Sequence, residues 1–377
     1  MRIGIDARVL YAPVLKGIGV YLDNLLMQLS KIDKKNEYIL YYDSRQETIK
    51  RFPRIDNFIE KGIEIGKGDR FYLWEQIKLS FEVRKDKINV FHSPANTTMF
   101  FMSCPTIVTV HDTIAQEVAK DRIWDSLYFN TIQPAILRNA NKIVAPSTYS
   151  KNRIASIMNV PSGNIMVIPN GIDESFRELK DKDILGVIKA KYKIEENYIL
   201  NVGGESPWKN ISSLIKAYAI LMRKGSIQEQ LVIAGIRKKD ILQKHLKEIE
   251  LLGIEKKVLI LGYLPIGDLA YLYSGATIFV YPSLREGFGF PPLEAMASGV
   301  PVVASDSASI PEVVGSAAIL VHAAKAENIA KGIETLLLDS DIRNNLIAAG
   351  FKRCKEFSWQ KTAEETLRIY EEASRNN

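Results

Sequence analysis

Two glutamates, Glu286 and Glu294, lie in a segment whose pattern suits the binding of a hydroxyl-rich ligand. An apolar run, Ile278–Tyr281, leads into a glycine-bearing turn that holds Glu286. Pro291 and Pro292 then open a predicted helix whose first turn holds Glu294. A strand, turn and helix in this order aim backbone N–H groups at the carboxyl edge of a sheet, where open α/β sheets bind ligands. Two carboxylates, which only accept hydrogen bonds, predict a ligand that carries hydroxyls as well as phosphate.

A structural interpretation is available for one of these glutamates but not for the other. An acidic residue in the first turn of a helix, as expected for Glu294, stabilises the helix by ~0.3–1 kcal/mol through the dipole alone. Glu286 instead interrupts a strand end beside glycines, where a turn would usually carry Asn, Asp or Ser. We therefore interpret the pair as functional.

Lys209 lies in a second strand–glycine–helix segment, in which Gly203 and Gly204 form the turn. A lysine at a helix N-terminus adds a full positive charge to the dipole, and this combination suits a diphosphate. The alternative is a solvated lysine beside a Ser-Pro turn.

Near the start of the chain, Gly17 and Gly19 follow Lys16 between the first predicted strand and the first predicted helix. Glycines there let a phosphate approach the backbone, or they form a merely structural tight turn. The third glycine of the dinucleotide fingerprint is absent, which disfavours NAD.

His111 ends a predicted strand, Ile107–His111, and is followed by Asp112. Its imidazole, neutral or cationic, could donate a hydrogen bond to a substrate hydroxyl or phosphate. His92 also ends a predicted strand, and we interpret it as a hydrogen-bonded structural group.

Two Asp-x-Asp pairs have the spacing by which some sugar-nucleotide enzymes hold a metal ion. They begin at Asp181 and Asp339, in charged linker or helix-boundary segments rather than at strand ends. We interpret both as solvated charge and predict no catalytic metal and no cofactor.

The composition predicts a two-domain globular protein of the cytoplasm. A chain of 377 residues exceeds one usual domain core. Its only cysteines, Cys104 and Cys354, fit a reducing compartment, and the first residues read as a strand rather than a signal peptide. The net charge of +6 favours anionic ligands or an anionic membrane surface, or is simply a solvated basic surface. Because the basic residues are scattered, we predict no nucleic-acid partner.

Short apolar runs alternate with amphipathic helices in two series, which predicts two parallel sheets covered by helices. A strand-free charged segment, about 173–197, joins the two series, and a last helix is predicted from residue 358 to about 374. We expect an α/β fold of two Rossmann-like domains, 1–175 with 358–377 and 176–357, whose facing carboxyl edges line a ligand cleft. The predicted strands are Ile3–Asp6, Tyr38–Tyr42, Asn89–Ser93, Ile107–His111, Lys142–Pro146, Ile165–Pro169, Ile199–Val202, Leu231–Ala234, Val258–Leu261, Ile278–Tyr281, Val302–Ser305 and Ala318–Val321.

Together these motifs resemble the family-4 retaining glycosyltransferases of the GT-B fold. The resemblance runs over nearly the whole chain, and its glutamate pair with the intervening Gly-Phe-Gly is the specific part. It is carried by Glu286-Gly-Phe-Gly-Phe-Pro-Pro-Leu-Glu294, Tyr273-Ser-Gly-Ala, Phe279-Val-Tyr-Pro-Ser283, Gly299-Val-Pro-Val-Val303, Pro311-Glu312, His92-Ser-Pro-Ala-Asn96, Val110-His-Asp112, Ser147-Thr-Tyr-Ser150 and Ile168-Pro-Asn-Gly171.

The resemblance implies a role for each site residue. Glu294 would accept from the ribose hydroxyls of a nucleotide and Glu286 from hydroxyls of the donor sugar, while Lys209 would hold the leaving diphosphate. His111 would lie close to the transferred sugar. The other donor-binding positions are Gly17, Gly19, Gly203 and Gly204 near the diphosphate, Tyr263 and Leu264 near the base, and Gly287, Phe288, Gly289, Phe290 and Leu293 within the glutamate segment.

One departure from the family pattern concerns the diphosphate. Where relatives often carry arginine, this chain has Gly204 and Trp208. A charge-assisted contact of this kind is worth ~1.5–3 kcal/mol, so donor binding is weaker or another cation replaces it. Arg237 and Lys238 are the candidates.

The resemblance implies metal-independent transfer of a mannosyl-, rhamnosyl- or glucosyl-type hexose from a nucleoside-diphosphate sugar to a glycan or lipid-linked acceptor. The α-configuration would be kept by front-face attack. The aromatic stretch Phe71-Tyr-Leu-Trp74 and the basic first half would suit an acceptor at the inner face of the cell membrane, with peripheral association. The alternatives are an epimerase, a phosphorylase or a non-catalytic sugar-nucleotide-binding subunit.

Overall fold

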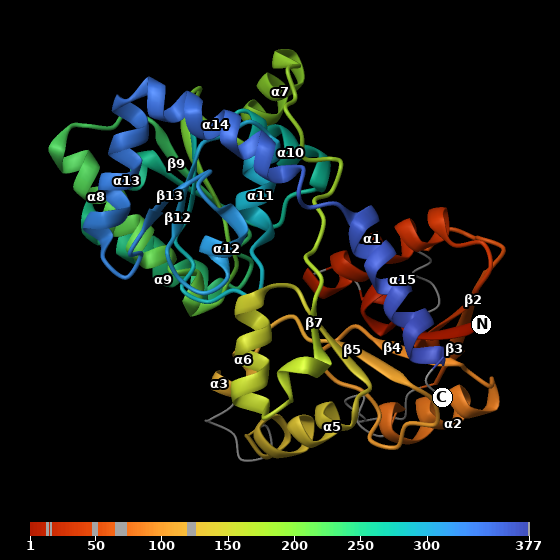
Figure 1. Cartoon of the computed structure of the whole chain (residues 1–377). Helices are drawn as coiled ribbons and strands as arrows, with labels where there is room; N and C mark the ends of the chain where they lie inside the picture. The colour runs from red at the N-terminus through yellow and green to blue at the C-terminus, as the bar shows by residue number, and fades with distance from the viewer. Residues whose placement is uncertain (13–14, 16, 47–51, 65–73, 119–125, 376–377) are drawn as a thin grey trace. The chain divides into compact units, whose positions relative to one another are not determined.

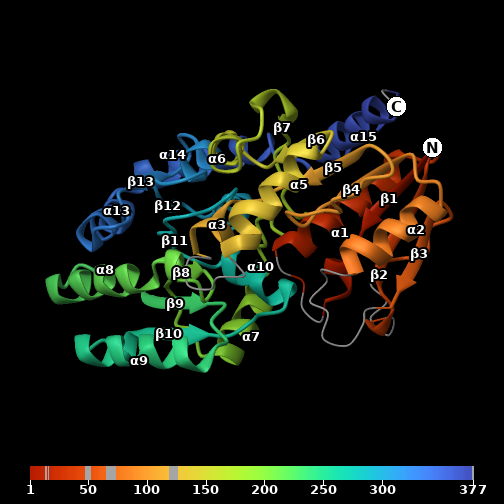
Figure 2. The same ribbon diagram turned by 90° about the horizontal axis from the view of Figure 1, so that it is seen from below.

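The computed structural model describes residues 1–12, 15, 17–46, 52–64, 74–118 and 126–375. The chain divides into two compact units, Met1–Gly171 with Ser358–Asn377 and Ile172–Phe357 (Figure 1). Each unit is a parallel sheet with helices on both faces, which confirms the predicted α/β fold class (Figures 1 and 2). No helix in the described ranges combines the length and the apolar content that crossing a bilayer requires.

The first unit has a seven-stranded sheet with the order β3-β2-β1-β4-β5-β6-β7. Its strands are β1 (Arg2–Asp6), β2 (Glu37–Asp43), β3 (Phe58–Ile63), β4 (Val90–Ser93), β5 (Thr106–Thr109), β6 (Lys142–Ala145) and β7 (Ile165–Val167). Its helical segments are η1 (Arg8–Tyr11), α1 (Gly17–Ile32), η3 (Trp74–Leu79, a π-helix), α2 (Ser80–Lys85), α3 (Ile114–Val118), η5 (Tyr128–Ile132), α5 (Gln133–Asn139), α6 (Thr148–Met158) and α15 (Trp359–Arg375).

The second unit has a six-stranded sheet with the order β10-β9-β8-β11-β12-β13. Its strands are β8 (Tyr198–Val202), β9 (Gln230–Ala234), β10 (Val258–Leu261), β11 (Ile278–Tyr281), β12 (Val302–Ser305) and β13 (Ile319–Val321). Its helices are α7 (Lys182–Tyr192), α8 (Ile211–Lys224), α9 (Lys239–Leu252), α10 (Ile266–Ser274), α11 (Phe290–Ala297), α12 (Ile310–Val314), α13 (Ala326–Leu338) and α14 (Ser340–Cys354).

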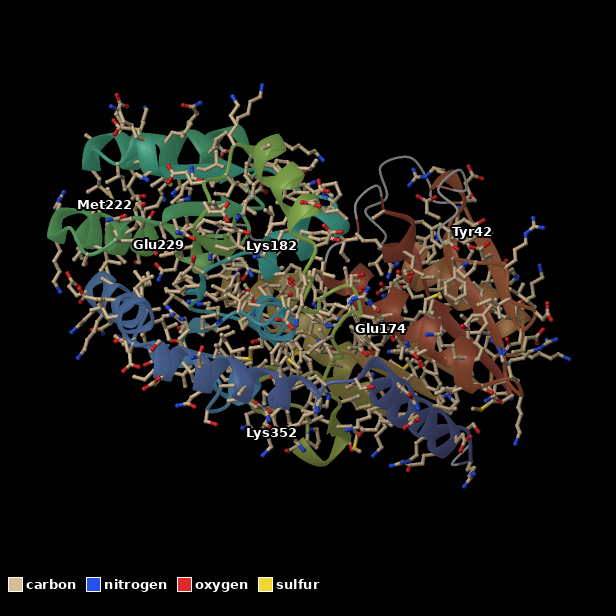
Figure 3. All side chains as sticks on the ribbon, turned by 90° about the horizontal axis from the view of Figure 1, so that it is seen from above. Tyr42, Glu174, Lys182, Met222, Glu229 and Lys352 are labelled. Carbon is tan, nitrogen blue, oxygen red and sulfur yellow. The ribbon has the colours of Figure 1, made fainter. Side chains whose placement is uncertain are left out.

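Two apolar cores cover the two faces of the second sheet, because successive residues of a strand point to opposite sides. In β11, Ile278 and Val280 join the core under α8 and α13. Phe279 and Tyr281 join the core under α10 and α11. Side chains fill the space between helices and sheet in each unit, as seen around Met222 on α8 and Tyr42 on β2 (Figure 3). This alternation turns the hydroxyl of Tyr281 toward the α11 side of the sheet.

The last helix, α15, packs on α1 of the first unit, as predicted for the end of the chain (Figure 1). Thr362 donates to the carbonyl of Pro169 over 2.7 Å. Tyr370 lies 2.6 Å from Nδ1 of His92, whose Nε2 lies 2.8 Å from the hydroxyl of Thr109. Burial lowers the pKa of His92 to about 3, so its ring is neutral at physiological pH. This buried network confirms the structural interpretation of His92.

One sequence prediction is corrected by the fold and another is made more specific. Strand β3 was not predicted, because Glu60 and Lys61 interrupt its apolar pattern at the edge of the sheet. The two Asp-x-Asp pairs lie at helix boundaries, as predicted, and the first aspartate of each also caps a helix. Asp181 accepts from two backbone N–H groups at the start of α7, and Asp339 does the same for α14.

We expect Gly235→Ala to destabilise the second unit, because Gly235 lets the loop after β9 approach the loop after β8. Its φ is +104°, and an added Cβ would lie 2.4 Å from the carbonyl oxygen of Gly203. The expected loss is roughly 2–3 kcal/mol, or a melting temperature lower by roughly 5–10 °C in calorimetry. Gly267→Ala, in α10 with open space around it, is the control and should be neutral or slightly stabilising. Equal melting temperatures for the two variants would contradict this account.

Candidate active site

The candidate site in the second unit lies where the strand order reverses. β8 and β11 are neighbours in the sheet although they are far apart in the sequence. The loop after β8 carries Lys209, and the loop after β11 carries Glu286. In open parallel sheets this switch point is where ligands bind, because the loops on its two sides diverge.

Lys209 and Glu286 form an ion pair with Nζ and Oε1 2.7 Å apart. Their side chains keep 20% and 14% of their surface exposed, so the pair is largely desolvated but reachable. Lys209 also donates to the hydroxyl of Tyr281 over 2.9 Å. Tyr281 and Ser283 in turn donate to Oε1 of Glu286 over 2.8 and 2.6 Å. Four polar side chains therefore form one connected network at the end of β11.

This network leaves hydrogen-bonding capacity directed at a ligand. All three donors of the network reach the same oxygen of Glu286, Oε1. Among the residues that the structure describes, none donates to Oε2. An ammonium group has three hydrogens, and the described partners of Lys209 take two of them. The pair can thus accept from one ligand group and donate to another without being broken.

Glu294 lies on α11 and accepts from the hydroxyl of Tyr273 over 2.8 Å at Oε2. The helix begins at Phe290, so Glu294 is its fifth residue and not part of the first turn as predicted. Burial raises the pKa of Glu294 to about 7, while the hydrogen bond from Tyr273 opposes this rise. The positive charge of Lys209 also opposes the rise in the pKa of Glu294, so Lys209 interacts electrostatically with both glutamates.

The turn between the two glutamates is held by backbone geometry and by one buried serine. Gly289 has a φ of +105° and precedes the first residue of α11. Ser309 donates toward the carbonyl oxygens of Glu286 and Phe288 over 3.0 and 2.8 Å. Gly287 and Phe288 are buried, and the Phe288 ring packs against Phe290 and Phe357. Leu293 has no exposed surface. Phe288 and Leu293 therefore offer a ligand only their backbones.

Two further loops, those after β9 and β10, lie at the same edge of the sheet as the loop that carries Lys209. In the loop after β8, an added Cβ at Gly204 would lie 3.9 Å from Cε of Lys209, an ordinary contact distance. Glu205 accepts from the backbone N–H groups of Arg237 and Lys238 over 2.8 and 2.6 Å. The guanidinium of Arg237 lies 5.9 Å from the ring centre of Tyr263, which is exposed. The neighbouring Leu264 is buried in the core. Arg237 and Lys238 thus follow β9 as predicted and are tied to the glycine loop through Glu205.

In the first unit, His111 lies two residues beyond β5, which ends earlier than predicted. Its Nε2 lies 2.9 Å from the carbonyl oxygen of Pro94, so this nitrogen carries the hydrogen. Burial lowers the pKa of His111 to about 4 and keeps the ring neutral. In the free protein the hydrogen of this ring is therefore directed at Pro94, and donation to a substrate stays a prediction. Its Nδ1 is an acceptor, and no described residue donates to it.

Gly17 and Gly19 occupy the first turn of α1. An added Cβ at Gly17 would meet nothing within 4 Å, whereas one at Gly19 would lie 2.7 Å from a side-chain carbon of Leu15. Packing therefore disfavours a side chain at Gly19, whereas no described residue contacts the added Cβ at Gly17. Lys16 and residues 71–73 of the predicted aromatic stretch lie outside the described residues.

Sequence reasoning missed the hydroxyl groups that position the carboxylates, namely those of Tyr273, Tyr281, Ser283 and Ser309. The available signal was a tyrosine at the last position of an otherwise apolar strand, followed by a serine two residues later. In the part of the chain that is described, no three His, Cys, Asp or Glu side chains lie close enough together to hold a metal ion.

Comparison with known families and proteins gives matches over most of the chain. The family model described as Glycosyl transferases group 1 matches residues 187–353, which include Lys209 and both glutamates. The model described as Glycosyltransferase Family 4 matches residues 15–176, which include Gly17, Gly19 and His111.

Individual relatives agree with these matches. The O-antigen chain mannosyltransferase B of Escherichia coli is 29% identical over 374 residues, which cover 94% of this chain and 96% of that protein. The serotype-specific mannosyltransferase WbdA of Escherichia coli is 29% identical over 264 residues. This match covers 68% of this chain but 32% of WbdA, which is about a third of the length of WbdA. The solved sucrose-phosphate synthase (tll1590) from Thermosynechococcus elongatus has a TM-score of 0.80 over the full length of both chains at 18% identity, which confirms the GT-B fold.

The raised pKa of Glu294 predicts a pH dependence of stability. An acid whose pKa is about 7 when folded and 4.5 as a model compound holds its proton more tightly in the folded state. Its contribution to stability is complete below pH 4.5, is lost as the pH rises toward 7, and is constant above that. We expect the free energy of unfolding of the wild type, measured by denaturant titration relative to Glu294→Gln, to fall between pH 5 and pH 7 with a slope of at most about 1.4 kcal/mol per pH unit. A difference that does not change with pH would show that Glu294 titrates normally.

Proposed function

We propose that this chain, which belongs to the family-4 glycosyltransferases of the GT-B fold, transfers a hexose, most consistently a mannosyl group, from a nucleoside-diphosphate sugar to a hydroxyl of a glycan or lipid-linked acceptor. The observation that carries this proposal is the network of Lys209, Tyr281, Ser283 and Glu286 at the switch point of the second sheet. It presents a cation for a diphosphate next to an acceptor oxygen for sugar hydroxyls.

Each polar group of the network has a role in the proposed donor complex. The third N–H of Lys209 donates to the leaving diphosphate, and the charge of the ammonium group stabilises it. The backbone N–H groups around Gly203 and Gly204 donate to the same diphosphate. Oε2 of Glu286 accepts from hydroxyls of the sugar. Oε1 of Glu294, which lies opposite the oxygen bound by Tyr273, accepts from the ribose. Gly287 and Gly289 offer backbone N–H groups along the same turn.

The chemistry that suits this arrangement is front-face transfer. Negative charge builds on the leaving phosphate as the anomeric carbon gains oxocarbenium character, and Lys209 stabilises that charge. Glu286 is poorly suited as a covalent nucleophile, because three hydrogen bonds, one of them from the cation of Lys209, draw charge from its carboxylate, and because its Oε2 is assigned here to hydroxyls of the sugar. The leaving phosphate would therefore accept the proton of the attacking hydroxyl, and the α-configuration would be kept. In this scheme the diphosphate charge is met by protein cations, so no metal is required.

The first unit carries two proposed ligand-binding groups of its own. Nδ1 of the neutral His111 would accept from a hydroxyl of the transferred sugar, and Gly17 would leave the N-terminus of α1 open to an anion. The mannosyl assignment and a surface-polysaccharide acceptor are supported by the relative of Escherichia coli that spans nearly the whole chain, an O-antigen chain mannosyltransferase.

Comparing two variants tests the division of roles between the cation and the carboxylate. Lys209→Met should weaken binding of both the free nucleoside diphosphate and the nucleotide sugar by roughly 10–100-fold, because each carries the diphosphate. Glu286→Gln should weaken binding of the nucleotide sugar by roughly tenfold or more but leave the nucleoside diphosphate nearly unaffected. Isothermal titration calorimetry gives both affinities.

Lys216→Met is the matched control, since Lys216 is an exposed lysine on α8 of the same unit. Its two affinities should equal those of the wild type. If Glu286→Gln weakened both ligands equally, or neither, the assignment of Glu286 to the sugar would be wrong.

A donor panel tests the reaction itself. Uridine, guanosine and thymidine diphosphate sugars of mannose, rhamnose and glucose are offered with a polysaccharide acceptor, and release of nucleoside diphosphate is measured with and without EDTA. We expect release to depend on the acceptor, to persist in EDTA and to give an α-linked product by NMR. Conversion of a nucleotide sugar without acceptor would indicate an epimerase, and a requirement for free phosphate would indicate a phosphorylase.

A further inference from the structure

One surface of the first unit combines exposed apolar side chains with exposed basic ones. The apolar members are Ile77, Phe81, Phe100 and Phe101, of which Phe81 and Phe101 expose 64% and 76% of their surface. The basic members are Lys78, Arg84, Lys85 and Lys87, all of them exposed. We call these eight residues the apolar–basic surface. Isolated exposed apolar residues are common, but a contiguous group edged by one sign of charge marks an interaction site.

This surface is formed by two chain segments that are bonded side by side. Gln76 donates to the carbonyl of Thr98 and accepts from the N–H of Phe100, over 3.2 and 2.7 Å. Ser80 donates to the carbonyl of Phe101 over 3.1 Å. These bonds fix the segment that follows β4 along η3 and α2, and they leave the rings of Phe100 and Phe101 outside, 5.2 Å apart.

The helical part of the surface is held in the fold by buried side chains on its opposite side. Trp74, Leu79 and Val83 are fully buried in the core of the first unit. Ile77, Phe81 and Arg84 lie on the exposed side, and α2 is at the outside of this unit (Figure 2). The helix is therefore apolar on both sides, and only its inner side is covered by the fold. A helix with a charged rim and exposed large apolar residues is typical of segments that lie in a membrane interface.

The charge of the surface is positive because the nearby acids are already paired. Glu82 and Asp86 both bind Lys61, each over 2.7 Å, and Asp86 also accepts from Tyr41. In contrast, the four basic members form no ion pair with any residue that the structure describes. Lys78 donates only to a backbone carbonyl, that of Glu64. Their charges are thus available to an anionic partner.

A hollow of about 360 Å³ lies within the surface, between α2 and the segment before β5. Arg84 and Lys87 line it together with the hydroxyls of Ser80 and Ser103 and the apolar side chains of Phe101 and Met102. Two cations and the hydroxyl of Ser103 suit a phosphate group, and the apolar wall suits the chain attached to it. A phospholipid headgroup unites these two properties.

We propose that the apolar–basic surface docks the first unit onto an anionic lipid bilayer. Phe81, Phe100 and Phe101 enter the interface between headgroups and acyl chains, and the four basic side chains bind lipid phosphates around them. This inference concerns binding to the bilayer and does not depend on the donor or acceptor of the proposed reaction. Its consequence is that a lipid-linked acceptor would be met at the membrane surface rather than in solution.

Vesicle co-sedimentation of the full chain tests the docking. Vesicles of phosphatidylcholine are compared with vesicles that contain phosphatidylglycerol in addition, at low and high salt. We expect binding only to the anionic vesicles and weaker binding at high salt. Arg84→Gln with Lys87→Gln should lower the partition coefficient by about 30-fold, and Phe81→Ser with Phe101→Ser by about tenfold or more.

Matched controls come from the second unit. Leu251→Ser with Leu338→Ser removes side chains that are 87% and 75% exposed, and Lys244→Gln with Lys247→Gln removes two exposed charges of α9. Both control variants should bind vesicles like the wild type, and all four should keep the wild-type melting temperature, because only exposed side chains change.

Three outcomes would overturn the proposal. These are no binding of the wild type to anionic vesicles, equally tight binding to neutral ones, and unchanged binding of the two variants of the surface. Sedimentation velocity tests the alternative that a second copy of the chain covers this surface. That alternative would hold if the wild type were a dimer that binds no vesicles, and if Phe81→Ser with Phe101→Ser converted the dimer to a monomer.

Discussion

The ion pair between Lys209 and Glu286 is the interaction on which the candidate site depends. It links the loops after β8 and β11 at the point where the strand order of the second sheet reverses. A buried charge is costly unless it is paired and hydrogen-bonded, and here Tyr281 and Ser283 supply the additional bonds. Because those bonds converge on one oxygen, the pair is stable in the free protein and still has a free acceptor and a free donor.

The rest of the second unit serves to hold this pair in place. The left-handed Gly289 and the buried Ser309 set the turn that carries Glu286 toward α11. The close approach of Gly235 to Gly203 brings the loop after β9 to the glycine loop beside Lys209. Glu205 then ties Arg237 and Lys238 to the same loop, which keeps two cations near the position where relatives often carry an arginine. The expected replacement of that arginine stays a proposal.

The first unit differs from the second in that its two histidines are neutral and form hydrogen bonds within the unit. His92 joins β4 to α15 through Tyr370, and His111 donates to Pro94. The positive charge of this unit is instead carried outward, by the lysines and the arginine of the apolar–basic surface. The proposed roles of this unit are therefore separate: a neutral acceptor at His111 for a hydroxyl, and exposed basic and aromatic side chains for an anionic surface.

The sequence alone predicted two parallel α/β sheets, the helix that returns to α1, the two glutamates and Lys209, because strand periodicity and glycine turns are local properties. It did not predict β3, whose polar residues are tolerated only because it is an edge strand. It placed Glu294 one helical turn too early and left the proton of His111 undecided, since a cap and a tautomer depend on neighbours distant in sequence. Only the tertiary structure brought Tyr273 to Glu294 and Tyr281 to Lys209 and left Phe81 and Phe101 exposed. Which oxygen of a carboxylate is free, and which apolar residue is uncovered, follows from packing between segments and not from any pattern within one.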